Sequence, residues 1–339
     1  MEKNNPFLSF QQKQEASYSF KKIWNPDWFQ GNRQMKNYFE GWYFKSVSEN
    51  GRHSMAFIPG ISVNGTDSHS FVQAINGKTG QTWYFRYPLE AFKYDAGGFS
   101  VAVGPNFFSK KGFELDLQNE TGFFKGKLSF GETARFPVSL RRPGIMGWYR
   151  YVPFMECYHG VVSLDHAVKG SIESTEGLFN FSNGRGYIEK DWGTSMPEAW
   201  IWMQTNHFSQ AGTSFMLSIA KIPWIGSSFT GFLGFFLHQG QLFPFATYTG
   251  AKVATIEHTA DELFIKIKSR KFSLEMTAEK GEKGRLKAPV SGNMDRVIHE
   301  SIDATIQIKL FNRKGNILFT GSGTNAGLEL VGETSILSP

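Results

Sequence analysis

Apolar and polar residues alternate along much of the chain. The alternation is clearest at residues 263–268, 272–276 and 302–310, where every second residue is apolar. A period of two places successive side chains on opposite faces of an extended strand, so these segments are predicted to be half-buried antiparallel strands. Turn signals separate the strands at Asn76-Gly77, Ala96-Gly97-Gly98, residues 279–284 and residues 312–315. No helix longer than a few turns is predicted.

A long uncharged segment runs from Ile222 to Ala251. A membrane-spanning helix needs about 20 mainly apolar residues. This segment is instead interrupted by Ser227, Ser228, Thr230, His238 and Gln239. Its composition therefore favours two buried strands around a turn at residues 238–241.

The sequence also contains an internal repeat of short motifs. Three pairs of segments share a nearly constant spacing: residues 40–44 with 198–202, residues 113–117 with 263–267, and Asn76-Gly77 with Gln239-Gly240. This spacing favours two similar all-β halves, the first ending near the glycine-rich residues 183–186. Chance similarity between short aromatic strands is the alternative. A closed or nearly closed antiparallel sheet of about eight strands would give each half room for one small ligand.

Length and composition agree with a two-domain β protein. A chain of 339 residues exceeds what a single hydrophobic core usually organises. The 33 Phe and 36 Gly favour strands and turns over helices. The single Cys157 excludes an internal disulfide and a zinc site built on paired cysteines.

The net charge of +6 is spread along the chain. No block of Lys and Arg interleaves with aromatic residues, which argues against a nucleic-acid partner. A mild attraction to anionic membranes stays open, and with it peripheral membrane contact. The polar N-terminus lacks the apolar core of a secretory signal, so a cytoplasmic location is expected.

Candidate chemistry is densest between residues 186 and 208. On an extended strand Tyr187, Glu189 and Asp191 share one face, while Lys190 and Trp192 share the other. The following strand places five more residues on a common face: Glu198, Trp200, Trp202, Gln204 and Asn206. Aromatic rings of this size could clamp an apolar ring or chain, while the amides hydrogen-bond a hydroxyl or carbonyl. The competing interpretation is a sandwich core in which amides satisfy the tryptophan N–H groups.

Four motifs resemble the tocopherol cyclase family. They are Glu40-Gly41-Trp42-Tyr43-Phe44-Lys45, Tyr158-His159-Gly160, residues 186–193 and residues 200–206, and they follow the family's order across roughly residues 24–335. The resemblance implies an all-β fold of two consecutive lipocalin-like antiparallel β-barrel or calyx domains, as in related carotenoid hydratases. We expect these domains at residues 24–183 and 184–339, after an N-terminal extension of residues 1–23.

The resemblance also implies a reaction. In tocopherol cyclase an acid protonates the alkene of a prenylated hydroquinone, and the phenol oxygen captures the tertiary cation to close a chromanol ring. A carboxylic acid in an aromatic pocket has a raised pKa and keeps the proton that it must donate. Aromatic faces stabilise the developing cation, and no cofactor is required. The implied partner is an apolar small molecule, a prenylated quinol or an isoprenoid.

The site residues follow from these motifs. The expected catalytic residues are Glu189, Asp191 and His159, although plant members of the family have Asn at the position of Asp191. The expected substrate contacts are Glu40, Trp42, Tyr43, Tyr158, Lys190, Trp192, Trp200, Trp202, Gln204 and Asn206. Lys190 is expected to pair with Glu40 or Glu198. The eight His show no metal-ligand spacing, so no metal is expected.

Two other functions stay open on the sequence alone. A hydratase would admit water to the same cation, and a lipocalin-like carrier would bind an apolar ligand without reaction. Acids clustered beside tryptophans favour catalysis over carriage. The substrate, the oligomeric state, and whether one or both domains form the site are not specified by the sequence.

Overall fold

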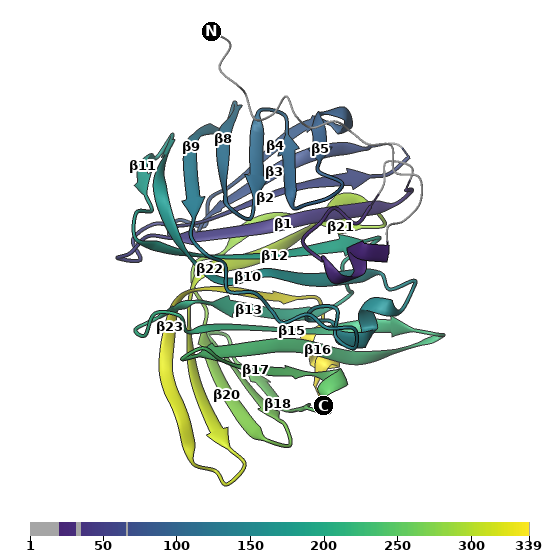
Figure 1. The fold of residues 1–339 in the computed structure, drawn as a ribbon, viewed down its shortest axis with the longest axis vertical. Coiled ribbons are helices and arrows are strands. Elements are labelled where there is room, and N and C mark those ends of the chain that lie inside the picture. Colours follow the sequence, from purple (N-terminus) through teal and green to yellow (C-terminus); the bar gives the residue numbers. More distant parts are fainter. Residues whose placement is uncertain (1–19, 32–34, 66, 339) are drawn as a thin grey trace.

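The first half of the chain forms one antiparallel sheet. The computed structural model describes residues 20–31, 35–65 and 67–338 (Figure 1). The first sheet has the strand order β4-β3-β2-β1-β12-β10-β9-β8-β7-β6-β5, with β11 beside β10. Its strands are β1 (Tyr38–Val47), β2 (Ser54–Val63), β3 (His69–Asn76), β4 (Thr82–Pro88), β5 (Phe92–Tyr94), β6 (Ser100–Val103), β7 (Asn106–Ser109), β8 (Gly112–Asn119), β9 (Gly122–Phe130), β10 (Cys157–Ser174), β11 (Gly177–Asn180) and β12 (Gly184–Gly193).

The second half forms another sheet. Its order is β17-β16-β15-β13-β23-β22-β20-β19-β18, with β14 beside β23 and β21 beside β22. The strands are β13 (Trp200–Thr205), β14 (His207–Phe208), β15 (Ser214–Trp224), β16 (Ser227–His238), β17 (Gln241–Ala246), β18 (Lys252–His258), β19 (Glu262–Lys268), β20 (Phe272–Glu279), β21 (Gly284–Val290), β22 (Asn293–Asn312) and β23 (Ile317–Val331).

Helical structure in the described ranges is limited to short 3₁₀ turns. These are η2 (Phe20–Trp24), η3 (Leu89–Ala91), η4 (Gly147–Tyr151), η5 (Thr247–Thr249) and η6 (Thr334–Leu337). Among the residues that the structure describes, no helix has the length and apolar character needed to cross a membrane. The uncharged segment 222–251 folds largely as the β16–β17 hairpin, which confirms the predicted pair of strands.

The two sheets share one topology. Reading outward from β1 gives β2, β3 and β4 on one side and β12, β10, β9 and β8 on the other. Reading outward from β13 gives β15, β16 and β17, then β23, β22, β20 and β19. The motif of residues 40–44 lies on β1, and residues 200–202 of the motif 198–202 lie on β13, the equivalent strand, so the predicted repeat is confirmed. The fold is all-β, with two consecutive lipocalin-like domains.

The domain boundary lies later than expected. The segment Gly184–Gly193 forms β12, which pairs with both β1 and β10 and completes the first sheet. The chain therefore changes sheets between Gly193 and Trp200 rather than at residue 183. Of the expected extension 1–23, residues 1–19 lie outside the described residues. Ile23 is buried, so residues 20–23 belong to the folded structure.

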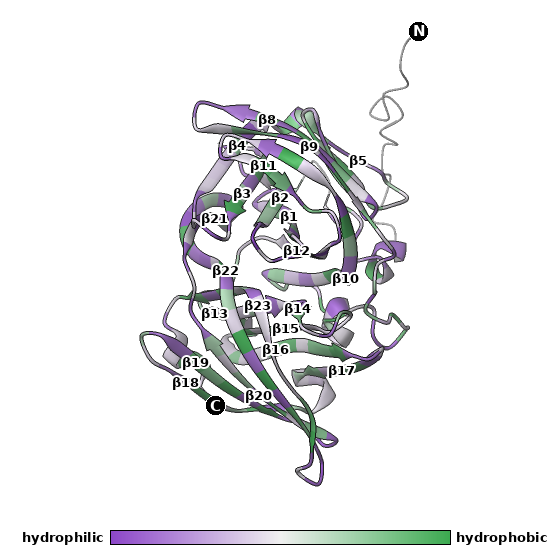
Figure 2. Ribbon diagram, turned by 90° about the vertical axis from the view of Figure 1, so that its left-hand side faces the viewer, coloured by the Kyte–Doolittle hydropathy of each residue, from purple (hydrophilic) through white to green (hydrophobic). Residues whose placement is uncertain are grey.

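The domains lie one above the other, with β10 and β12 next to β13 and β15 (Figures 1 and 2). Each domain has its own apolar core, and a third cluster fills the space between them. Successive residues of β1 serve different cores, because Trp42 and Phe44 point into the first domain while Tyr43 points toward the second. The β21–β22 hairpin also reaches the first domain, where the Gln73 side chain exchanges two hydrogen bonds with the Lys287 backbone, at 2.9 and 2.8 Å.

Candidate active site

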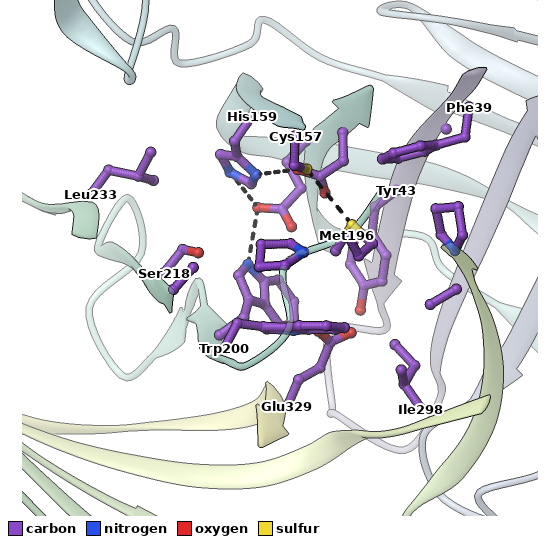
Figure 3. Close-up of a pocket in the computed structure, with 18 of the residues that line it drawn as sticks. Phe39, Tyr43, Cys157, His159, Met196, Trp200, Ser218, Leu233, Ile298 and Glu329 are labelled. Carbon is purple, nitrogen blue, oxygen red and sulfur yellow. Dashed lines mark hydrogen bonds and ion pairs between the residues drawn. The ribbon is translucent and has the colours of Figure 1, made fainter. Parts of the chain in front are cut away.

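A cavity of about 200 Å³ lies between the two domains (Figure 3). Its walls come from the outward faces of β1, β10 and β12 in the first domain, and of β13, β15, β22 and β23 in the second. Most of the lining is apolar or aromatic, including Phe39, Ile58, Tyr149, Trp200, Trp202 and Phe229. The site thus belongs to both domains and to the interior of neither.

One polar cluster in the cavity is centred on His159. Antiparallel pairing of β10 with β12 sets His159 opposite Asp191. The His159 Nδ1 lies 2.9 Å from Asp191 Oδ1, and Nε2 lies 3.4 Å from Glu189 Oε2. Burial alone would lower the pKa of His159, but the two carboxylates outweigh it and raise the pKa to about 10. The imidazole is therefore a buried cation between two carboxylates at neutral pH.

Glu189 is held by two further donors. The Tyr187 hydroxyl donates to Glu189 Oε2 at 2.6 Å, and the Trp202 indole N–H donates to the same oxygen at 3.3 Å. The alternation predicted for this strand is confirmed, since Glu189 and Asp191 face the cavity while Lys190 lies over the Trp192 ring on the opposite side. Gly327 leaves room for the Trp202 side chain, because a Cβ at residue 327 would collide with the indole ring.

A second cluster consists of two buried glutamates. Glu300 on β22 and Glu329 on β23 are paired residues of neighbouring strands, and both line the cavity. The Tyr43 hydroxyl donates to Glu300 Oε1 at 2.5 Å, and the Trp200 indole N–H donates to Glu329 Oε2 at 2.5 Å. The acidic pair is therefore held by one aromatic side chain from each domain.

Burial sets the protonation of this acidic pair. It raises the pKa of Glu300 to about 7, and it raises the pKa of Glu329 well above its ordinary value, with repulsion from Glu300 adding to the shift. The opposing influences on Glu300, from Tyr43 and Lys45, are weaker than burial. The pair consequently retains a proton at neutral pH inside an aromatic cavity.

Comparison with known protein families identifies the family of this chain. The family model described as tocopherol cyclase-like matches residues 127–332. The chain belongs to the tocopherol cyclase-like family. A probable chloroplastic tocopherol cyclase of Oryza sativa subsp. japonica is 25% identical over an alignment of 268 residues that covers 63% of this chain and 57% of that protein. The chloroplastic tocopherol cyclase of Zea mays is also 25% identical over 268 residues, with 63% of this chain and 56% of that protein covered. The chain thus matches little more than half the length of these relatives.

Solved structures share the fold of this tocopherol cyclase-like chain. The crystal structure of CghA superposes with a TM-score of 0.54 at 8% identity, covering 87% of this chain and 89% of CghA. A putative AttH from Nitrosomonas europaea superposes with a TM-score of 0.53 at 11% identity, covering 89% and 94% of the two chains. At these identities the likeness concerns the fold.

The structure brings together six of the residues expected at the site. His159, Glu189 and Asp191 line the cavity, as do Tyr43, Trp200 and Trp202. Trp202 packs edge-on against the Tyr43 ring, with 5.4 Å between the ring centroids. The expected aromatic lining is thus supplied by the tryptophans of β13 rather than by those of β1 and β12.

The other five motif residues of the first domain point away from the cavity. They are Glu40, Trp42, Tyr158, Lys190 and Trp192. Lys190 forms a buried ion pair with Glu40, as predicted, and its ammonium lies 4.4 Å from the centre of the Trp42 ring. Tyr158 stacks on Trp192. Their expected role as substrate contacts does not fit this position, because alternate residues of β1, β10 and β12 face the core of the first domain.

Gln204 and Asn206 also lie outside the cavity. Gln204 Oε1 accepts a hydrogen bond from the Lys45 ammonium at 2.9 Å. Asn206 Nδ2 donates to Asp165 Oδ1 at 2.9 Å and to the Gly186 carbonyl at 2.8 Å. Both amides therefore join the second domain to the first, and the expected hydrogen bonds to a substrate are replaced by hydrogen bonds between domains.

Sequence reasoning did not find Glu300 and Glu329. They lie outside the motifs that carry the family resemblance, and Glu300 is 257 residues from its hydrogen-bond partner Tyr43. One signal was available at Glu329, which interrupts the apolar run from Ala326 to Val331. An acid in such a run is either exposed or functional.

The His159 cluster has the composition of a cation site. The ligand atoms of His159, Glu189 and Asp191 lie within 4.8 Å of one another. Both ring nitrogens of His159 already face carboxylate oxygens, so a metal would have to displace a ring proton to bind there. The expectation that no metal takes part stays a prediction.

Proposed function

We propose that the protein is an intramolecular cyclase that closes an oxygen ring on a prenylated phenol or quinol in the cavity between its domains. The observation that carries the proposal is the protonated acidic pair, Glu300 and Glu329, beside an aromatic wall. The family supports the reaction class, because its curated relatives are named tocopherol cyclases.

The first step is protonation of the alkene. The acidic pair donates its proton to the less substituted alkene carbon, and the π electrons form the new C–H bond. A tertiary cation remains on the adjacent carbon, and the pair is left one proton poorer. Burial suits Glu329 to this step, since it raises the pKa of the carboxyl well above its ordinary value and so favours the protonated acid.

The cation then needs stabilisation without water. The faces of Trp200, Trp202 and Tyr43 offer electron-rich surfaces at the cavity wall. The apolar lining excludes water that would otherwise capture the cation and give a hydrated product.

Ring closure requires a proton acceptor. The phenol oxygen forms the C–O bond with the cation, and its proton passes to Glu189. The sequence placed the acid at Glu189 or Asp191, but their pairing with the His159 cation suits both carboxylates to accepting a proton rather than donating one. Transfer of that proton back to the acidic pair completes an isomerisation that needs no cofactor.

Product analysis tests the proposal. The purified chain is incubated with a panel of prenylated hydroquinones, and the products are analysed by mass spectrometry after chromatography. A cyclase yields a new compound of unchanged mass with one phenol hydroxyl fewer. A product heavier by one water would identify a hydratase, and binding of the quinol without turnover would identify a carrier.

A further inference from the structure

Exposed apolar side chains gather on one face of the protein. Eleven large apolar side chains are exposed in the described residues, and six of them come from two neighbouring segments. We call these six the apolar face: Val138, Leu140, Trp148, Tyr151, Phe154 and Ile225. The first five lie in the connection between β9 and β10, and Ile225 is at the tip of the β15–β16 hairpin.

Contacts join these two segments. The Tyr151 hydroxyl donates to the Leu140 carbonyl at 2.5 Å. Trp148 stacks on Tyr149, with ring centroids 4.1 Å apart. Tyr149 in turn packs edge-on against Trp224, the residue before Ile225, at 6.2 Å. Figure 1 shows η4 close to the β15–β16 hairpin at the right of the molecule. These contacts hold η4 against residue 140 on one side and against the base of the β15–β16 turn on the other.

The two most exposed members have costly backbone conformations. Phe154 is 97% exposed with φ of 68°, and Ile225 is 91% exposed with φ of 32°. Bulky and β-branched residues rarely adopt positive φ. Ile225 precedes Gly226, also at positive φ, in a two-residue hairpin turn where Asn-Gly is the favoured pair. Neither side chain packs into the protein, so local turn preference and core packing both leave their apolar character unexplained.

The same connection forms part of the cavity wall. Met155 lines the cavity while its neighbour Phe154 stands in solvent, and Tyr149 lines it beside the exposed Trp148. On the hairpin, Phe229 lines the cavity and packs against Trp224. The apolar face therefore lies directly outside the cavity.

Basic residues occur in the same connection as the apolar face. Arg135 and Arg141 are exposed and Arg142 is partly exposed, while Glu132 and Glu156 are the exposed acids of the same connection. The whole chain carries a net charge of +6. Apolar side chains beside arginines match the chemistry of an anionic bilayer surface, where rings enter the interface and guanidinium groups meet lipid phosphates.

We infer that the apolar face docks on an anionic phospholipid bilayer and sets the cavity against the membrane. An apolar substrate can then pass from the lipid into the cavity without crossing water. The inference rests on the proposed function only for the nature of that substrate, because the docking itself follows from the surface.

Vesicle co-sedimentation of the full chain tests the inference. The vesicles contain phosphatidylcholine alone or mixed with phosphatidylserine. Phe154→Asn and Ile225→Asn remove the apolar side chains with a residue that tolerates positive φ, so thermal unfolding should be unchanged. Each is expected to weaken binding about tenfold or more, since burial of one large apolar side chain is lost. Arg141→Glu should weaken binding to the anionic vesicles at least about fivefold and should not weaken binding to neutral ones.

Leu178→Asn is the matched control. Leu178 is exposed on β11, which lies on the opposite side of the molecule in Figure 1, and its replacement should leave vesicle binding at the wild-type level. If the Phe154→Asn and Ile225→Asn variants bound vesicles as tightly as the wild type, the inference would be overturned. A dimer in sedimentation velocity that these variants abolish, without vesicle binding by the wild type, would also overturn it by assigning the face to a second copy.

Activity separates this inference from the proposed function. With detergent-solubilised quinol the Phe154→Asn and Ile225→Asn variants should turn over at the wild-type rate, while with quinol in vesicles they should be slower. An equal rate in both media would contradict docking. A wild type that binds vesicles but converts no quinol would refute the proposed cyclase and leave the docking intact.

Discussion

The Tyr43 hydroxyl of the first domain donates a 2.5 Å hydrogen bond to Glu300 of the second. Glu300 pairs with Glu329 across β22 and β23. The acidic pair of the second domain therefore accepts a hydrogen bond from an aromatic side chain of the first domain. The His159 cluster lies on the first-domain side of the same cavity. The proton donor and the proton acceptor that we propose thus come from different domains, and such a site would require both halves of the repeat.

Glu329→Gln should lower kcat by about 10²–10⁴-fold, the usual effect of losing a positioned general acid. The change is nearly isosteric, and the amide oxygen can still accept the hydrogen bond from Trp200. Steady-state turnover of a prenylated hydroquinone measures the effect. Glu198→Gln is the matched control, because Glu198 is an exposed acid just before β13, the strand that pairs with β23, and should be replaceable at no cost in rate.

The reaction should slow as pH rises through about 7. Glu300 has its pKa raised to about 7 by burial, so in this range it becomes a carboxylate beside Glu329, whose pKa the new negative charge raises further. Glu329 then holds its proton more tightly and is a weaker acid toward an alkene. The His159 pKa of about 10 keeps the imidazole protonated throughout. A pH–rate profile from pH 5 to 9 measures the change. A kcat that rises with pH through neutrality would contradict the assignment of the acid.

The free energy of unfolding should also depend on pH through Glu300. Glu300 binds its proton more tightly in the folded protein than at its ordinary pKa of 4.5. Its contribution to folding is therefore complete below pH 4.5 and declines as pH rises to about 7. Lys45, whose pKa is lowered by burial to about 7, acts in the separate window between 7 and 10.5. Urea unfolding of Glu300→Gln against wild type should isolate the contribution of Glu300, because the amide does not titrate.

Lys190→Met should destabilise the first domain by about 3–5 kcal/mol, because Glu40 would remain as a buried charge without its cation. Glu40 also accepts the backbone N–H groups of Gln30 and Gly31, at 3.0 and 3.1 Å, and so holds the segment before β1. The double variant Glu40→Gln with Lys190→Met should recover most of the loss. Urea unfolding measures both changes, and equal stability of the single variant and wild type would contradict the structural role.

The sequence predicted the strands and the repeat because both depend on local periodicity. Alternation also assigned Glu189 and Asp191 to one face of β12 and Lys190 to the other. It could not identify which face meets the cavity, because β1 and β12 are buried on both sides and no polar face marks the exterior. Trp42 and Trp192 were therefore placed at the site, although they belong to the core of the first domain.

The acidic pair depends on contacts that sequence spacing does not encode. Glu300 reaches the cavity because the β21–β22 hairpin leaves its own domain and packs on the first. Register shifts between β22 and β23 follow directly after this point, between Ser301 and Ala304. Tyr43 and Glu300 meet only when both domains have folded and docked. The local sequence pattern therefore predicts the strands, whereas the residues that form the cavity depend on how the two domains dock.

The most direct test of the account is a turnover experiment in deuterated water. The proposed acid exchanges its proton with solvent before each turnover, so cyclisation of a prenylated hydroquinone should place one deuterium on carbon, at the former alkene position. Mass spectrometry and NMR of the product locate it, and Glu329→Gln should form almost no labelled product in the same time. A cyclised product without carbon-bound deuterium, or equal labelling by wild type and Glu329→Gln, would contradict protonation by the acidic pair.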